Sequence, residues 1–177
     1  IAVKPQIIDK VLAEIAETEG LVVSIAAGIR LARIEAALSS ARVIRVLPNT
    51  PCLVGAMAAG YALGAQATEE DAVLVAQLLS TAGEAILLEE ELLDAVTGLS
   101  GSGPAFVARL VEAFTEGGVA AGLERETARR LTLATFAGTV RLLEAKEMSP
   151  EELVAMVSSP GGTTIAGREI LENSGVR

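Results

Sequence analysis

Blocks of apolar and polar residues alternate along the first half of the chain, and their spacing predicts helices and strands in turn. Between Pro5 and Gly20 the apolar residues recur at helical spacing, as on one face of an amphipathic helix. Short apolar runs follow, which are typical of strands buried on both faces. The pattern predicts a helix after Pro5, strands over residues 21–25, 43–47, 57–63 and 85–88, and helices over residues 29–38 and 68–81. This alternation indicates an α/β fold with crossover helices.

The pattern changes after the acidic run Glu89-Glu90-Glu91, where strands give way to helices alone. We interpret this run as the solvated start of a helix rather than as an acidic binding tail. The apolar spacing beyond it predicts helices over residues 104–121, 125–146, 150–157 and 163–172. The sequence therefore predicts an α/β domain over residues 1–91 and an all-α domain over residues 92–177.

The composition excludes several classes of partner. A net charge of -9 and an aromatic content of 2% argue against nucleic-acid binding, which needs a basic face and stacking rings. The uncharged run from Val46 to Thr68 is long enough to cross a bilayer, but its prolines and its few large aliphatic residues favour a buried strand with loops. We therefore expect a protein that binds neither nucleic acid nor membrane. The single Cys52 forms no intrachain disulfide, so we expect a cytoplasmic location.

The chain contains no histidine, which restricts its possible chemistry. Histidine is the commonest general base and the commonest metal ligand, so we predict neither a Ser-His-Asp triad nor a metal site. Hydride transfer from a nicotinamide is compatible with this composition, because the cofactor carries the difficult step and the protein supplies orientation and polarity.

The segment Pro160-Gly161-Gly162-Thr163-Thr164 lies between two predicted helices and leads into the second. Backbone N–H groups at a helix start bind carboxylate or phosphate well, and two threonine hydroxyls add donors and acceptors. The same residues are also ordinary turn-and-cap residues. Spacing alone favours the cap.

Other glycine-rich and strand-end segments are weaker candidates. The order of glycines from Gly98 to Pro104 does not match a dinucleotide fingerprint, because a helix rather than a strand is expected before it, and a hinge or tight helix packing is the better interpretation. The loops at residues 2–5, 26–28 and 49–51 follow strands, so we expect them at one sheet edge, where open α/β sheets bind ligands. Lys4 in the first loop is as well explained by solvation as by contact with an anion.

These segments occur together in one order that carries a family resemblance. The set comprises Ala2-Val3-Lys4-Pro5, Ile25-Ala26-Ala27-Gly28, Pro48-Asn49-Thr50-Pro51, the stretch from Thr97 to Phe106, Gly117-Gly118-Val119, and the stretch from Ser159 to Gly167. It resembles the pyrroline-5-carboxylate reductase family over nearly the whole chain.

The resemblance implies a partial Rossmann-like NAD(P)-binding domain followed by an all-α helical dimerisation and substrate-binding domain. The glycine fingerprint of the cofactor domain is expected before Ile1, and further residues are expected after Arg177. The implied oxidoreductase activity is hydride transfer from NADPH or NADH to the C=N bond of 1-pyrroline-5-carboxylate, giving L-proline in the last step of proline biosynthesis. A homodimer or a larger ring is implied, with each active site between one cofactor domain and the helices of both subunits.

The resemblance also implies residue roles. Thr164 is expected to contact the ring nitrogen of the substrate as the catalytic residue. Where the family often has Asp-Asn, this chain has Ala155-Met156, which puts an amide contact with the cofactor in doubt. The implied cofactor-binding residues are Ala2, Val3, Lys4, Pro5, Ile25, Ala26, Ala27, Gly28, Asn49, Thr50 and Met156. The implied substrate-binding residues are Glu147, Val157, Ser158, Ser159, Gly161, Gly162, Thr163 and Thr164.

Two alternatives stay open at this point. A related dehydrogenase acting on a C–OH/C=O pair normally uses a lysine of the helical domain, and Lys146 is the only lysine after Lys10, with no such motif around it. The other alternative is a non-catalytic dimerisation or scaffold protein that keeps the fold.

Overall fold

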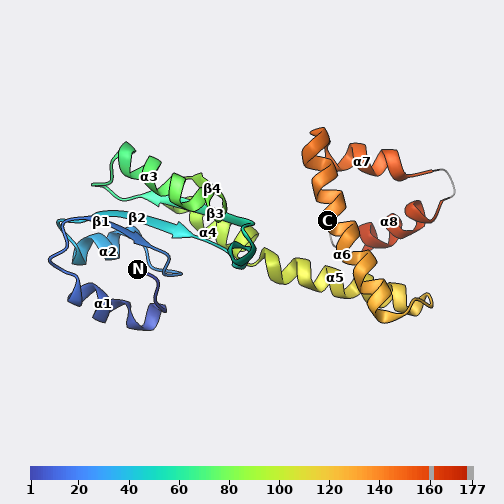
Figure 1. The fold of residues 1–177 in the computed structure, drawn as a ribbon, viewed down its shortest axis with the longest axis horizontal. Coiled ribbons are helices and arrows are strands. Elements are labelled where there is room, and N and C mark those ends of the chain that lie inside the picture. The colour runs from blue at the N-terminus through green and yellow to red at the C-terminus, as the bar shows by residue number, and fades with distance from the viewer. Residues whose placement is uncertain (160–161, 175–177) are drawn as a thin grey trace. The chain divides into compact units, whose positions relative to one another are not determined.

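The computed structural model describes residues 1–159 and 162–174. The chain forms two compact units, Ile1–Ala108 and Arg109–Arg177, and helix α5 (Gly103–Ala120) begins in the first and continues in the second (Figure 1). The sequence-based domain boundary at residue 91 stays a prediction.

The first unit is built around a four-stranded sheet in the order β1-β2-β3-β4. Strands β1 and β2 are parallel, β2 and β3 are antiparallel, and β3 and β4 are parallel. The strands are β1 (Leu21–Ser24), β2 (Arg42–Leu47), β3 (Met57–Leu63) and β4 (Gly83–Leu87); the helices that flank them are α1 (Ile8–Glu14), α2 (Leu31–Ala37) and α3 (Glu69–Ser80). Short 3₁₀ helices at Pro5–Ile7 and Thr50–Val54 complete this part of the chain. The predicted α/β organisation is confirmed.

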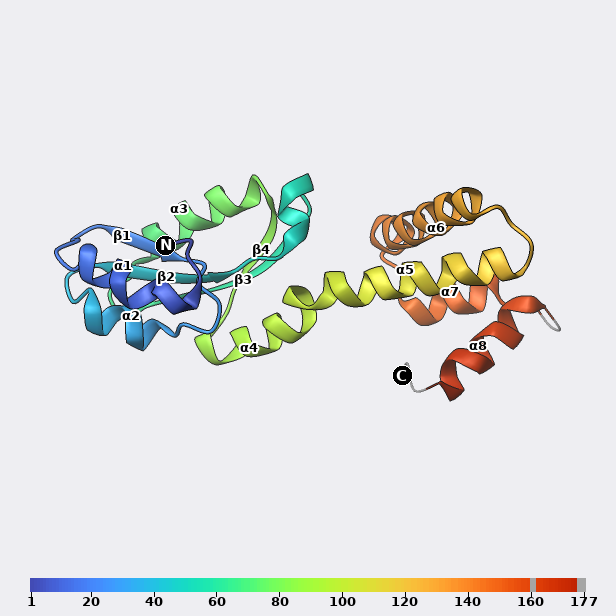
Figure 2. The ribbon, with the colours of Figure 1, turned by 90° about the horizontal axis from the view of Figure 1, so that it is seen from below.

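Alternate residues of β2 point into two separate apolar cores. Val43 and Leu47 pack with residues of α1 and α2 on one face of the sheet, whereas Ile44 and Val46 pack with residues of β3 and α3 on the other. Figures 1 and 2 show α1 and α2 on the face opposite α3. Each fully buried aliphatic side chain of this kind contributes roughly 1.5–3 kcal/mol. The strand is therefore buried on both faces, as its apolar run over residues 43–47, interrupted by Arg45, predicts.

Three short helical segments connect β4 to α5. They are a 3₁₀ helix at Glu90–Leu92, helix α4 (Leu93–Val96) and a π-helical turn at Thr97–Gly101. Helix α4 packs closely on β3 at Gly60, where an added Cβ would lie 2.9 Å from Cγ2 of Val96. Only glycine allows this approach without displacement. The acidic run does begin a helix, but the interpretation that it is solvated is wrong for Glu90, whose side chain is 19% exposed and pairs with a buried arginine.

The second unit is all-helical, as predicted. It contains most of α5, α6 (Arg125–Lys146), α7 (Pro150–Val157) and α8 (Thr163–Asn173). An ion pair between Arg125 and Glu116 joins the start of α6 to α5, and the rings of Phe114 and Phe136 meet edge to face with centroids 5.1 Å apart. Helix α7 begins at a capping box of Ser149 and Glu152. Within the described part of the chain, no helix combines the length and apolar character that crossing a membrane requires.

The start of α3 provides a pH-dependent contribution to stability. The Asp71 carboxylate accepts a hydrogen bond from the backbone N–H of Thr68 at 3.0 Å and one from Nε of Arg42 at 2.7 Å. The Thr68 bond chiefly, and then Arg42, lower the pKa of Asp71 from its ordinary value. A lowered pKa in the folded state stabilises the protein above the unfolded-state pKa, and this stabilisation is lost as pH falls through the folded-state pKa.

We therefore expect Asp71→Asn to lower the melting temperature at neutral pH by more than it does in acid. The difference between wild type and variant should shrink as pH falls below the ordinary aspartate pKa of about 3.9. Thermal unfolding at a series of pH values measures this difference, with Glu84→Gln on β4 as the exposed-carboxylate control. A difference that stays constant across the acid range would contradict the assignment.

Candidate functional site

The strand-end loops of the first unit share one edge of the sheet. The Ile1 N–H bonds to the Val23 carbonyl and the Ile25 N–H bonds to the Ile1 carbonyl, which is the pattern of parallel pairing. Because β1 and β2 are also parallel, the residues that follow Ile1, β1 and β2 all leave the sheet at the carboxyl ends of parallel strands. The expected placement of the three loops at one edge is confirmed. Their contact with a cofactor stays a prediction.

The surface of this edge is made of small and exposed residues. Ala26 is 1% exposed, so it offers a ligand almost no surface of its own. Gly28 adopts a left-handed conformation, with φ of 71°, that L side chains rarely adopt. Of the other predicted cofactor residues here, Val3 and Asn49 are partly buried, and Ala2, Lys4, Pro5, Ile25, Ala27 and Thr50 are exposed. Small side chains and one exposed lysine fit a flat, anionic dinucleotide.

Two groups that the sequence analysis missed fix the loop between β1 and α2. Ser24, fully buried, accepts a hydrogen bond from the Ala26 N–H at 3.3 Å. At the other end of the loop, Oε1 of Glu90 accepts from the Leu31 N–H at 2.7 Å and from Nη1 of Arg45 at 2.9 Å. The N-cap residue of α2, Arg30, makes no side-chain cap. Glu90, from a distant part of the chain, therefore caps this helix instead. The sequence did contain one sign of this buried ion pair, because Arg45 is a charged residue within the otherwise apolar run of β2.

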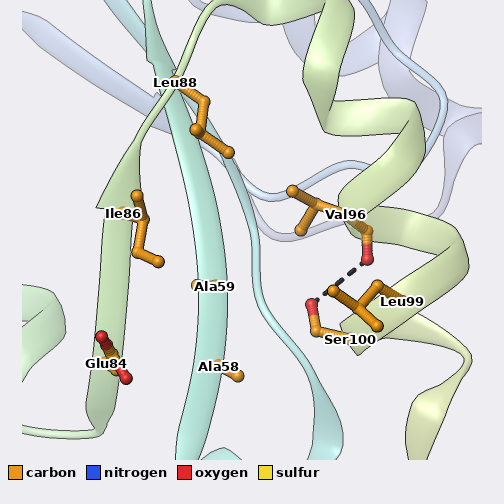
Figure 3. Close-up of a pocket in the computed structure, with 8 residues that line it drawn as sticks. All are labelled: Ala58, Ala59, Glu84, Ile86, Leu88, Val96, Leu99 and Ser100. Atoms are coloured by element: carbon orange, nitrogen blue, oxygen red, sulfur yellow. Dashed lines mark hydrogen bonds between the residues drawn. The ribbon is translucent and has the colours of Figure 1, made fainter.

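A small apolar groove lies on the sheet beside α4. It has a volume of about 150 Å³ and lies between β3, β4 and the π-helical turn (Figure 3). None of the predicted site residues lines it. The lining residues are Ala58, Ala59, Glu84, Ile86, Leu88, Val96, Leu99 and Ser100.

In the second unit, the predicted anion-binding loop does lead into a helix start. Helix α8 has Gly162 as its N-cap and Thr163 and Thr164 in its first turn, both exposed. The Gly162 N–H donates to the Ser159 carbonyl at 3.0 Å, whereas the Thr163 and Thr164 amides donate to no group within residues 1–159 and 162–174. Such first-turn amides suit a carboxylate. Gly161, also predicted to bind substrate, lies outside the described residues.

The other predicted residues of this unit line different surfaces. Thr164 lines a groove of about 490 Å³ together with Phe114, Val154 and Arg168. Met156 and Val157 instead line a second groove of about 590 Å³ with Leu153 of the same helix. The sequence analysis did not single out Arg168, although the helix predicted over residues 163–172 already places it one turn after Thr164.

Ser158 and Glu147 each show an unusual local state. The Ser158 hydroxyl is buried, and no partner for it occurs among the described residues. Glu147, exposed at the end of α6, has φ of 51°, a left-handed conformation that helix ends usually give to glycine. Non-glycine residues in such conformations cluster at functional sites, which is consistent with the predicted position of Glu147 near the substrate.

Comparison with known proteins relates both units to one enzyme family. Residues 90–177 match the family model described as pyrroline-5-carboxylate reductase dimerisation. The pyrroline-5-carboxylate reductase of Synechocystis is 44% identical over 179 residues, which cover 100% of this chain and 67% of that protein. The chain belongs to the pyrroline-5-carboxylate reductase family. The Arabidopsis thaliana reductase is likewise 44% identical, over 99% of this chain and 65% of its own length, so the chain spans about two thirds of these relatives.

Solved structures of pyrroline-5-carboxylate reductases have the same fold. The enzyme from Coxiella burnetii superposes with a TM-score of 0.93 at 34% identity, covering 99% of this chain and 67% of that one. The Plasmodium falciparum enzyme, solved with NADP bound, gives 0.90 at 32% identity, covering 97% of this chain and 71% of that one. The resemblance found in the ordered motifs is confirmed. Because the chain belongs to the pyrroline-5-carboxylate reductase family, we prefer this interpretation to the alternative of a related dehydrogenase that acts on a C–OH/C=O pair.

Proposed function

We propose that this chain acts as a pyrroline-5-carboxylate reductase. Such an oxidoreductase uses NADPH or NADH to reduce the C=N bond of 1-pyrroline-5-carboxylate, giving L-proline. The observation that carries this proposal is the identity of 44% over 100% of the chain with a relative of that activity. The local geometry supports it, because one unit offers a dinucleotide edge and the other a helix start suited to a carboxylate.

The first unit supplies the cofactor surface. A relative is solved with NADP bound, and the strand-end edge of this chain has the small residues and exposed Lys4 that fit such a molecule. The reduced nicotinamide supplies the hydride when it is bound. We assign the loops at residues 2–5, 25–28 and 49–50 to holding and orienting it. Met156 stays a cofactor-binding residue that the family resemblance alone implies.

The second unit supplies the substrate surface. The first-turn amides of Thr163 and Thr164, with Ser159 nearby, are assigned to the substrate carboxylate, because a helix N-terminus carries partial positive charge. The Thr164 hydroxyl is assigned to the imine nitrogen. A hydroxyl is a weak acid, so its role is to orient the imine and to relay a proton from water. Glu147, Val157, Ser158, Gly161 and Gly162 complete the proposed substrate site.

Self-association as a homodimer is part of the proposal. The second unit matches a dimerisation model and exposes large apolar side chains, among them Leu131 at 55%, Val140 at 54% and Ile170 at 71%. Exposed apolar surface of this extent is typical of a protein interface. Larger rings, a role in proline biosynthesis and a cytoplasmic location stay predictions from the sequence.

The proposed activity is tested by supplying the whole protein with 1-pyrroline-5-carboxylate and either reduced nicotinamide cofactor. We expect the cofactor absorbance to fall and L-proline to accumulate in equal molar amount. A hydroxyacid with oxidised cofactor serves as the comparison substrate for the related dehydrogenases. Turnover of the hydroxyacid without turnover of the cyclic imine would overturn the proposal.

A further inference from the structure

The segment from Thr97 to Pro104 has no role in the proposed chemistry, yet it folds in an unusual way. Residues Thr97–Gly101 form a π-helical turn, in which the Ser102 N–H donates to the Thr97 carbonyl at 2.9 Å. Such turns are rare, and they occur frequently at functional sites. The turn leads directly into α5.

Pro104 leaves one carbonyl of this turn without its helical partner. In an α-helix the carbonyl of Ser100 would accept from the N–H of residue 104, but proline has no N–H. The next amide, that of Ala105, donates instead to the Ser102 carbonyl at 3.0 Å. The helix itself therefore provides no donor for Ser100 from either residue.

The side-chain amide of Asn49 provides the missing donor. Nδ2 of Asn49 donates to the Ser100 carbonyl at 3.1 Å, and Oδ1 of the same side chain accepts from the Ala58 N–H at 2.9 Å. One amide thus joins the loop after β2, the start of β3 and the π-helical turn. Asn49 immediately precedes Thr50, so this bond fixes the end of the loop that we assign to the cofactor.

The rest of the turn is held by its own side chains. The Thr97 hydroxyl donates to the Leu93 carbonyl at 3.0 Å, and the Ser100 hydroxyl donates to the Val96 carbonyl at 3.2 Å (Figure 3). Val96 in turn packs against Gly60 of β3. The Asn49 amide is therefore the polar link between an already ordered turn and the strand-end loop.

We propose that Asn49 is a positioning residue whose amide replaces the hydrogen bond that Pro104 cannot make, and so holds the cofactor loop against the start of α5. The proposal rests on the proposed function for its effect on catalysis. The hydrogen-bond replacement itself does not depend on that function. It predicts that Asn49 and Pro104 are coupled, because supplying an N–H at residue 104 should make the Asn49 donor less necessary.

The test compares four forms of the whole protein: wild type, Asn49→Asp, Pro104→Ala and the double variant. Asn49→Asp keeps the acceptor for Ala58 but loses the donor to Ser100. We expect it to lower the cofactor-free melting temperature by about 2–6 °C and kcat by roughly tenfold. Pro104→Ala in the Asn49→Asp background should recover roughly half of both losses, because the new N–H serves the Ser100 carbonyl. Asn173→Asp on exposed α8 is the matched control.

The outcomes separate the possible roles of Asn49. Recovery of the melting temperature without recovery of kcat would show that the side chain acts directly on the cofactor, and would overturn the positioning role. An unchanged melting temperature in Asn49→Asp, or no coupling with Pro104→Ala, would overturn the hydrogen-bond replacement. The melting temperatures of Asn49→Asp and of the double variant are measured without substrate. They therefore test the hydrogen-bond replacement even if the wild type does not reduce the cyclic imine.

Discussion

Thr164→Ala is expected to lower kcat by about 10²–10³, the loss typical of removing one hydrogen-bonding group from the reacting centre. The affinity for the cofactor should change little, because Thr164 is assigned to the substrate and not to the cofactor. The hydroxyl is exposed in the first turn of α8 and lines the same groove as Arg168. Its removal deletes the group assigned to the imine nitrogen and leaves the helix intact, since alanine is a good helix former.

Steady-state kinetics with the cyclic imine and a separate cofactor titration check this expectation. Thr164→Ser should retain most of the activity, because it keeps the hydroxyl. The matched control is Thr127→Ala, which removes an exposed threonine from the first turn of α6. If kcat is the same in Thr164→Ala and Thr127→Ala, the Thr164 hydroxyl has no role in the chemistry.

Glu90→Gln is expected to destabilise the folded protein by about 3 kcal/mol, because it leaves the guanidinium of Arg45 buried without a counter-charge. The Arg45 side chain is 2% exposed, and its bond to Glu90 is 2.9 Å long. The substitution keeps an oxygen that can accept from the Leu31 N–H, so the loss of stability reports chiefly on the ion pair. Nε of Arg45 is buried and has no hydrogen-bond partner among residues 1–159 and 162–174, which raises the cost of burying this charge further.

Denaturant unfolding measures the effect, with Glu91→Gln as the neighbouring exposed control. The double variant Arg45→Met/Glu90→Leu should be more stable than Glu90→Gln, because replacing both charges by apolar groups removes the desolvation penalty. Equal stability of Glu90→Gln and Glu91→Gln would show that the buried pair contributes nothing.

Local patterns predicted the elements because their periodicity was strong. Strand β2 is predicted over residues 43–47 and observed at Arg42–Leu47, and α6 is predicted and observed over residues 125–146. The connection through α4 and the π-helical turn was not predicted in this form. Its geometry depends on contact with Gly60 and on the bond from Asn49, and neither is visible in local spacing.

The site was predicted unevenly for the same reason. The common edge of the three strand-end loops follows from strand order, which a sequence pattern can indicate. The roles of Thr164 and Ser159 came from family resemblance, because spacing alone favoured an ordinary cap. Arg45 and Glu90 were missed, since a charge run says nothing about a buried arginine 45 residues away along the chain.

At Glu147 the backbone conformation favours glycine, whereas the proposed substrate site uses the carboxylate of the side chain. Glycine would relax the backbone at the end of α6, where a side chain in this conformation costs roughly 1 kcal/mol. A search for heat-stable variants would therefore favour glycine at this position among its first choices, and each such choice would remove a carboxylate from the proposed substrate site. Stability and turnover of this enzyme are thus expected to diverge first at the turn between α6 and α7.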